Sequence, residues 1–225
     1  MKRFIFTAIV AAAGACVAWS QSEMRLGSLD AANAAGVTPA AVFADAPAAQ
    51  FPTIDRMTRL DMLDYFNSGS DKPSKNALAG NARVLSLSDS QITVETSGAQ
   101  TVEISLLPQK SDTLLVVVTT IKTPVADSSV DVYTSAWKPA GTGRFTAPGL
   151  EQWMLPEAKG QKEDLENLYP FTLASATFDP QTGVLTLTNN LGEYLPEIES
   201  KGREKLLRSS LSYRWNGKRF DPIKK

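Results

Sequence analysis

Apolar residues at helical spacing come first in this chain. Thr38 and Pro39 have the form of an N-cap and a first helical position, which predicts a short helix over 40–45. Pro52 precedes a second helical pattern over 54–66. The apolar residues of this second helix spread around much of its circumference. We therefore expect other elements to cover it on more than one side.

From residue 82 onward the apolar pattern has a period of two, which is typical of strands with one buried face. It predicts strands over 83–88, 91–96 and 101–107. The next run, 114–121, is continuously apolar or β-branched, as expected of a central strand that is buried on both faces. A return strand over 130–135 then completes an antiparallel meander.

A second and shorter succession of predicted helices and strands follows. Helical segments are predicted over 150–154 and 162–168, and strands over 171–178 and 184–188. Helices before strands in both halves indicate the α+β class: N-terminal helices, an antiparallel β-meander, then a smaller C-terminal half of helices and hairpins. The expected domain covers 38–225, either as one unit or as two halves, 38–140 and 150–225.

The clearest hairpin lies near the C-terminus, where Asn216-Gly217 fits a two-residue type I′ turn. This turn predicts three cross-strand pairs: Trp215 with Lys218, Arg214 with Arg219, and Tyr213 with Phe220.

Alternation then places Tyr213, Trp215 and Phe220 on the core face of the hairpin. Arg214 and Arg219 oppose each other on the outer face, where like charges destabilise a strand pair. Either solvent or an acid such as Asp221 offsets them, or the two guanidinium groups form a contact for an anionic group or a partner.

The N-terminus has the form of an export signal. Two basic residues precede an uncharged, mostly apolar run that ends near Trp19, too short to span a membrane. Residues 1–20 are the expected signal peptide, and 21–37 a tether or weakly ordered arm. Cleavage before Gln21 would remove Cys16. In the alternative, Ala13 to Cys16 is a lipobox and Cys16 becomes the lipidated first residue.

The amino-acid composition excludes several kinds of catalytic and binding site. The chain has 23 basic residues, 24 acidic residues, one cysteine and no histidine. The absence of histidine excludes imidazole bases and Ser-His-Asp triads. The near-neutral charge balance does not indicate the basic patch or stripe that nucleic-acid binding needs. We expect no cofactor, no metal site and no dedicated catalytic residues.

Two weak catalytic candidates remain. Ser135 and Lys138 fit the S-x-x-K spacing, but Pro139 disfavours the helix that this motif needs. Asp61 and Asp64 share a sector of the second predicted helix with Met57. We expect Asp64 to be at least half buried, and the two aspartates are the candidates for a carboxylate-dependent hydrolase.

Several stretches together resemble one uncharacterised family of exported Bacteroidales proteins, a domain of unknown function. They are Phe51-Pro52, residues 59–66, residues 114–122 with Pro124 and Asp127-Ser128, and residues 213–218. Some members are described as lipoproteins. The resemblance implies no site residue.

We therefore expect an exported protein of the periplasm or cell envelope that acts as a non-catalytic binding or assembly module. Its partner would be an envelope protein or a glycan, with membrane association only if Cys16 is lipidated. The alternatives are a carboxylate-dependent hydrolase acting on an envelope glycan, and a structural lipoprotein.

Overall fold

The computed structural model describes residues 36–110, 112–195, 200 and 202–224. The expected signal peptide, Cys16 and nearly all of the expected arm lie outside the described residues. No helix within those ranges is both long enough and apolar enough to cross a membrane.

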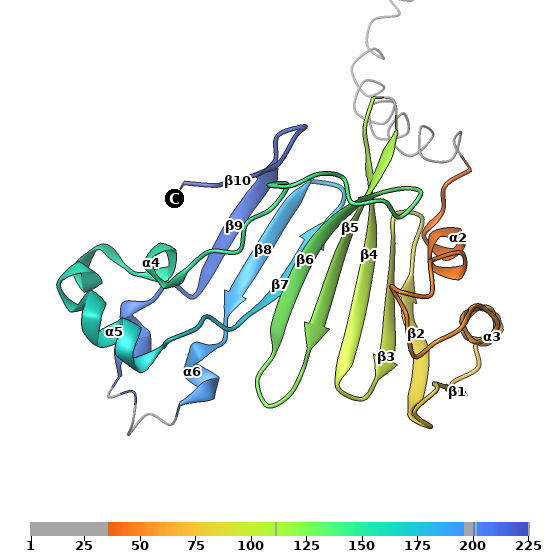
Figure 1. Cartoon of the computed structure of the whole chain (residues 1–225), viewed down its shortest axis with the longest axis horizontal. Helices are drawn as coiled ribbons and strands as arrows, with labels where there is room; N and C mark the ends of the chain where they lie inside the picture. Colours follow the sequence, from red (N-terminus) through yellow and green to blue (C-terminus); the bar gives the residue numbers. More distant parts are fainter. Residues whose placement is uncertain (1–35, 111, 196–199, 201, 225) are drawn as a thin grey trace, which may run out of the picture.

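A six-stranded antiparallel sheet forms the larger part of the fold (Figure 1). Its strands follow one another in sequence order, as the predicted meander requires. They are β1 (Ser74–Lys75), β2 (Asn81–Leu87), β3 (Gln91–Ser97), β4 (Gln100–Pro108), β5 (Thr113–Ile121) and β6 (Asp127–Thr134).

Two helices, α2 (Pro39–Ala44) and α3 (Arg56–Asn67), pack on one face of this sheet. The predicted N-cap of α2 is confirmed, because the Thr38 hydroxyl accepts from the amide of Ala41 at 3.2 Å. Helix α3 begins later than predicted. Asp55 caps it by accepting from the Thr58 amide at 2.7 Å, so Ile54 belongs to the preceding turn.

Arg59 is the buried charge of α3, with only 2% of its surface exposed. Its guanidinium donates to the carbonyl oxygens of Ala44 (3.1 Å), Ala46 (2.7 Å) and Ile54 (2.8 Å). The group also lies 5.6 Å from the centre of the Phe51 ring. Arg59 thus joins the end of α2 to the turn that precedes α3.

The second sheet has four antiparallel strands in the order β10-β9-β8-β7. Short helices lie towards one end of it (Figure 1), which confirms the α+β class with a smaller C-terminal half. The strands are β7 (Ala174–Asp179), β8 (Val184–Asn189), β9 (Ser210–Trp215) and β10 (Phe220–Pro222). The helices are α4 (Leu150–Trp153), η1 (Pro156–Gln161), α5 (Lys162–Leu168), α6 (Leu191–Tyr194) and η2 (Arg203–Leu206).

Strand β5 contributes to two hydrophobic cores. Leu115 and Val117 pack into the core beneath α2 and α3, whereas Val116 and Val118 belong to a second core shared with the four-stranded sheet. This confirms the prediction that the strand is buried on both faces.

The edge of β7 lies against the second face of the larger sheet, and Figure 1 shows β7 beside β6. Three of its backbone N–H groups donate to side chains of that sheet: Ala174 to Asp127 (3.0 Å), Ala176 to Ser128 (3.0 Å) and Phe178 to Glu103 (3.4 Å). Strand β7 therefore crosses from β6 towards β4, and side chains replace the strand partner that its edge lacks.

The C-terminal hairpin has a different register from the predicted one. Trp215 pairs with Phe220, and Arg214 with Asp221, around a four-residue loop. The Asn216 side-chain oxygen accepts from the amides of Lys218 and Arg219 at 2.8 and 2.9 Å and closes the longer loop.

Candidate functional site

The two aspartates of α3 are not where the sequence placed them. Asp61 and Asp64 are both exposed, and Asp64 does not lie on the buried face of α3 on which the sequence placed it. The error arises from the helix phase, because Met57, which served as an apolar marker, is 66% exposed. The buried face consists of Arg59, Met62 and Leu63.

Ser135 and Lys138 lie in a turn after β6 rather than on a helix. Between them, Trp137 adopts a positive φ of 59°, and its amide donates to the Thr134 carbonyl. The Ser135 hydroxyl donates to the carboxylate of Asp112 at 3.2 Å. The helical geometry that the S-x-x-K motif needs is therefore absent at this position.

The two hairpin arginines do not face each other. Arg219 forms an exposed ion pair with Asp221 at 2.8 Å, and the same carboxylate accepts from the side-chain NH2 group of Asn216. These contacts hold the pKa of Asp221 below its usual value, with the Asn216 hydrogen bond as the largest cause. Arg214 is exposed on the outer face of β9 with no ion pair among the described residues. A role of Arg214 in anion or partner contact stays a prediction.

Glu103 is a partly buried carboxylate that sequence reasoning missed. It lies on β4 and accepts from the Phe178 amide. Burial raises the pKa of Glu103 above its usual value, and the hydrogen bonds offset this only in part. The group fastens β7 to the larger sheet, and we assign it a structural role.

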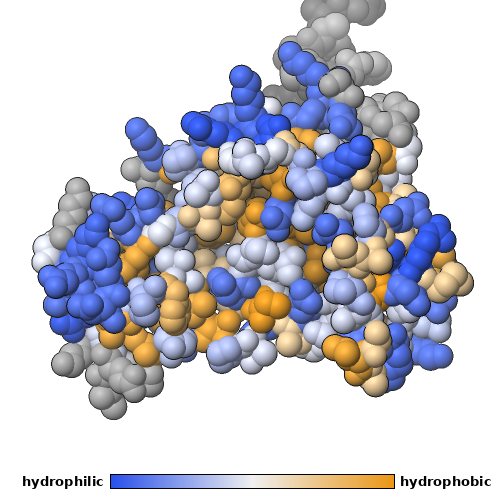
Figure 2. All heavy atoms as spheres, viewed as in Figure 1, coloured by the Kyte–Doolittle hydropathy of each residue, from blue (hydrophilic) through white to orange (hydrophobic). Residues whose placement is uncertain are grey.

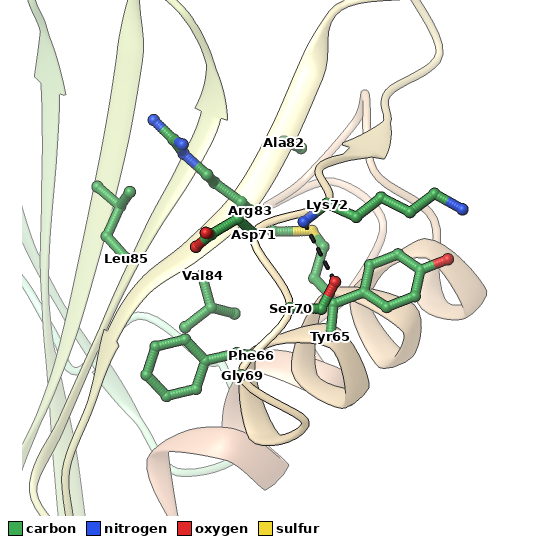
Figure 3. A pocket seen from close by; sticks show the side chains of 11 residues that line it. Tyr65, Phe66, Gly69, Ser70, Asp71, Lys72, Ala82, Arg83, Val84 and Leu85 are labelled. Atoms are coloured by element: carbon green, nitrogen blue, oxygen red, sulfur yellow. Dashed lines mark hydrogen bonds between the residues drawn. The ribbon is translucent and has the colours of Figure 1, made fainter.

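A hollow with a volume of about 280 Å³ lies between α3 and β2 (Figure 3). Helix α3 contributes Met62, Tyr65 and Phe66. The other walls are the loop 69–72 and residues 82–85 of β2.

The end of α3 fixes the position of the loop. The Gly69 amide donates to the carbonyl of Phe66, and the Ser70 amide to that of Tyr65, at 3.0 and 2.8 Å. This is the Schellman arrangement, which requires the left-handed φ of 68° at Gly69. The chain is thereby turned back across the end of the helix.

The hollow has an apolar side and a charged rim. Figure 3 shows the Phe66 ring below the side chain of Val84, with Leu85 further along β2. Asp71 and Arg83 lie on the same side as Leu85, whereas Tyr65 and Lys72 extend together away from it. The Lys72 amine lies 5.4 Å from the centre of the Tyr65 ring.

The edge of β2 is free along this hollow. Strand β1 pairs only with Asn81 and Ala82. No strand within the described ranges pairs with residues 83–87 on this side. A β-bulge displaces the register between Val84 and Ser86, and it leaves Leu85 42% exposed.

The comparison with protein families gives an extensive match. Residues 32–220 match the family described as "Protein of unknown function (DUF3256)". The chain belongs to this family. The family of unknown function expected from the sequence is therefore confirmed, while export and lipidation stay predictions.

One solved structure similar to this DUF3256 chain is "Structure of a domain of an uncharacterized protein from Porphyromonas gingivalis W83". It is 27% identical, with a TM-score of 0.67, and the match covers 81% of this chain and 97% of that one. A search of curated proteins gives no match. The comparisons support the fold and leave the function open.

The described part of the DUF3256 chain holds no cluster of three or more histidine, cysteine, aspartate or glutamate residues that could bind a metal ion. Figure 2 shows strongly hydrophilic atoms over the region of α4 and α5, and a mixed surface elsewhere on that face. The hollow offers a small apolar recess, three charged residues at its rim and a strand edge without a strand partner among the described residues. That combination suits binding.

Proposed function

We propose that this protein is an exported envelope protein whose role is to bind or assemble with a partner at the hollow between α3 and β2. The observation that carries the proposal is the free edge of β2, because exposed strand edges otherwise tend to be covered or blocked in soluble proteins. Here residues 83–87 run beside a recess and have no strand partner on this side among the described residues, although a bulge at Leu85 interrupts the ladder.

The side chains around the recess support binding rather than catalysis. Phe66 and Val84 provide contact area, whereas Asp71 and Arg83 provide charge at the rim. Asp61 and Asp64, the carboxylates considered for a hydrolase, are not part of the lining. A few polar groups around an apolar recess are typical of recognition sites.

The experiment uses a photo-crosslinking residue in cells that naturally make the protein. Leu85 is replaced by p-benzoylphenylalanine, and the control carries the same residue at Phe171. The two positions are 42% and 43% exposed, and Phe171 lies in the connection before β7, outside the hollow. We expect a discrete adduct at Leu85 only, in the envelope fraction.

Equal adducts at the two positions, or no adduct at Leu85, would overturn binding at the hollow. Recovery of the chain in the cytoplasm would overturn export. The intact mass of the same sample reports processing: a chain that begins at Gln21 supports simple secretion, and an acylated Cys16 supports the lipoprotein alternative.

A further inference from the structure

We propose that the hollow receives an extended segment of a partner protein, which adds to the free edge of β2 as a further strand. The segment would place one apolar side chain in the recess lined by Phe66, Val84 and Leu85. This inference rests on the proposed function and names the class of partner.

The first argument is that the strand position beside β2 is only partly filled. Ser74 pairs with Ala82, so the residue before it, Pro73, would come next to Arg83. Proline has no N–H to donate to a ladder, and the chain before it is held at the end of α3 by the Ser70–Tyr65 hydrogen bond. The chain thus leaves the strand line at the point where the hollow begins.

The second argument concerns the shape of the recess. Side chains of an added strand alternate between the two faces, so every second one would point towards α3. At about 280 Å³, the recess is slightly smaller than pockets that enclose whole small molecules, roughly 300–1,000 Å³. Its size therefore favours one or two side chains of a larger partner.

The third argument concerns selectivity. The bulge at Leu85 interrupts the regular ladder and limits how many residues can pair with β2. Bulges on edge strands hinder unspecific pairing with other strands. A partner would gain affinity from backbone hydrogen bonds to a short stretch and specificity from the side chain in the recess, as in other cases of strand addition.

The experiment uses a phage-displayed library of random dodecapeptides and the immobilised chain from Gln21 onward. Selected peptides are synthesised, and their affinities are measured for the unmodified chain and for two variants. Leu85→Glu places a charge on the lining of the hollow, at the free edge of β2. Ile121→Glu is the matched control, since Ile121 is 44% exposed and lies three strands away on β5.

We expect binding to fall by about tenfold or more with Leu85→Glu, and to change by less than about threefold with Ile121→Glu. Equal urea midpoints of the two variants establish that both are folded. Peptides that bind both variants equally, or a library that yields no binder, would overturn the inference.

N-methylation of single peptide amides tests the strand geometry. Only alternate N–H groups of an added strand point towards its neighbour. Methyl groups at alternate positions should therefore weaken binding by about tenfold, and those between them should have little effect. A loss without alternation would show that the peptide does not bind as a strand.

Failure of the peptide experiments can be separated from failure of the proposed function. If Leu85 still gives an adduct in cells while no dodecapeptide binds, the hollow has a partner of another kind. A glycan in that adduct would support binding at the hollow and would overturn the addition of a partner strand.

Discussion

Replacement of Arg59 by methionine is the most informative test of how the helical layer is held. Methionine keeps a long flexible stem but removes the guanidinium group. The three carbonyl oxygens that now accept from Arg59 belong to buried residues, Ala44, Ala46 and Ile54. Without Arg59 these acceptors lose their partner.

The size of the effect follows from opposing contributions. A hydrogen bond to a charged group contributes about 1.5–3 kcal/mol, and a stranded buried acceptor costs about 1–3 kcal/mol. Removal of the buried charge also removes its desolvation cost, which offsets part of this loss. That cost is the reason why burial lowers the pKa of Arg59. We expect Arg59→Met to reduce the free energy of unfolding by about 3–5 kcal/mol.

Arg56→Met is the control on the same helix. Arg56 pairs with Asp45 at 2.8 Å, but the side chains are 59% and 65% exposed, so its loss should cost less than about 1 kcal/mol. Urea unfolding followed by circular dichroism measures both, with an unchanged slope as the condition for comparison. Equal midpoint shifts for the two variants would refute the claim that Arg59 joins α2 to α3.

Three further predictions concern single positions. Gly69→Ala should cost about 1–2 kcal/mol in urea unfolding, because alanine is strained at the positive φ of 68° although it meets no atom within 4 Å; an unchanged midpoint would contradict this. Asp64→Ala should change stability by less than about 0.5 kcal/mol, because Asp64 is exposed; a loss above about 1 kcal/mol would show a missed contact. Burial raises the pKa of Glu103, so its contribution to stability is fullest in acid and is lost as the pH rises through the folded pKa. Glu103→Gln should remove this decline, so the difference between its urea midpoint and that of the unmodified protein should grow in its favour from about pH 4 to about pH 8; a constant difference would contradict the assignment.

The strands could be predicted because their signal is local. An alternation of period two reports directly which face is buried, and the continuous run in β5 correctly indicated two buried faces. Some boundaries were less accurate: the predicted strand over 171–178 begins only at Ala174, because Phe171 lies in the preceding connection. Single side chains also account for two wrong boundaries. Asp55 delays the start of α3, and Asn216 lengthens the hairpin loop.

The hollow could not be predicted, since it depends on how α3 lies against a strand distant in sequence. One local signal was present. Ala82 and Val84 follow the alternation, but Leu87 is out of phase with them, and Leu85 is an apolar residue at a position that should be polar. Such a change of phase within a strand indicates a bulge, and bulges are frequent beside functional sites.

The two faces of β5 also bear on the order in which the molecule can be completed. The chain is synthesised from its N-terminus, so the larger sheet can form before residues 174–189 exist. Until β7 and β8 arrive, Val116, Val118 and Val132 present an apolar face to solvent. A fragment that stops at residue 140 should therefore aggregate or bind chaperones, although it contains every strand of the larger sheet.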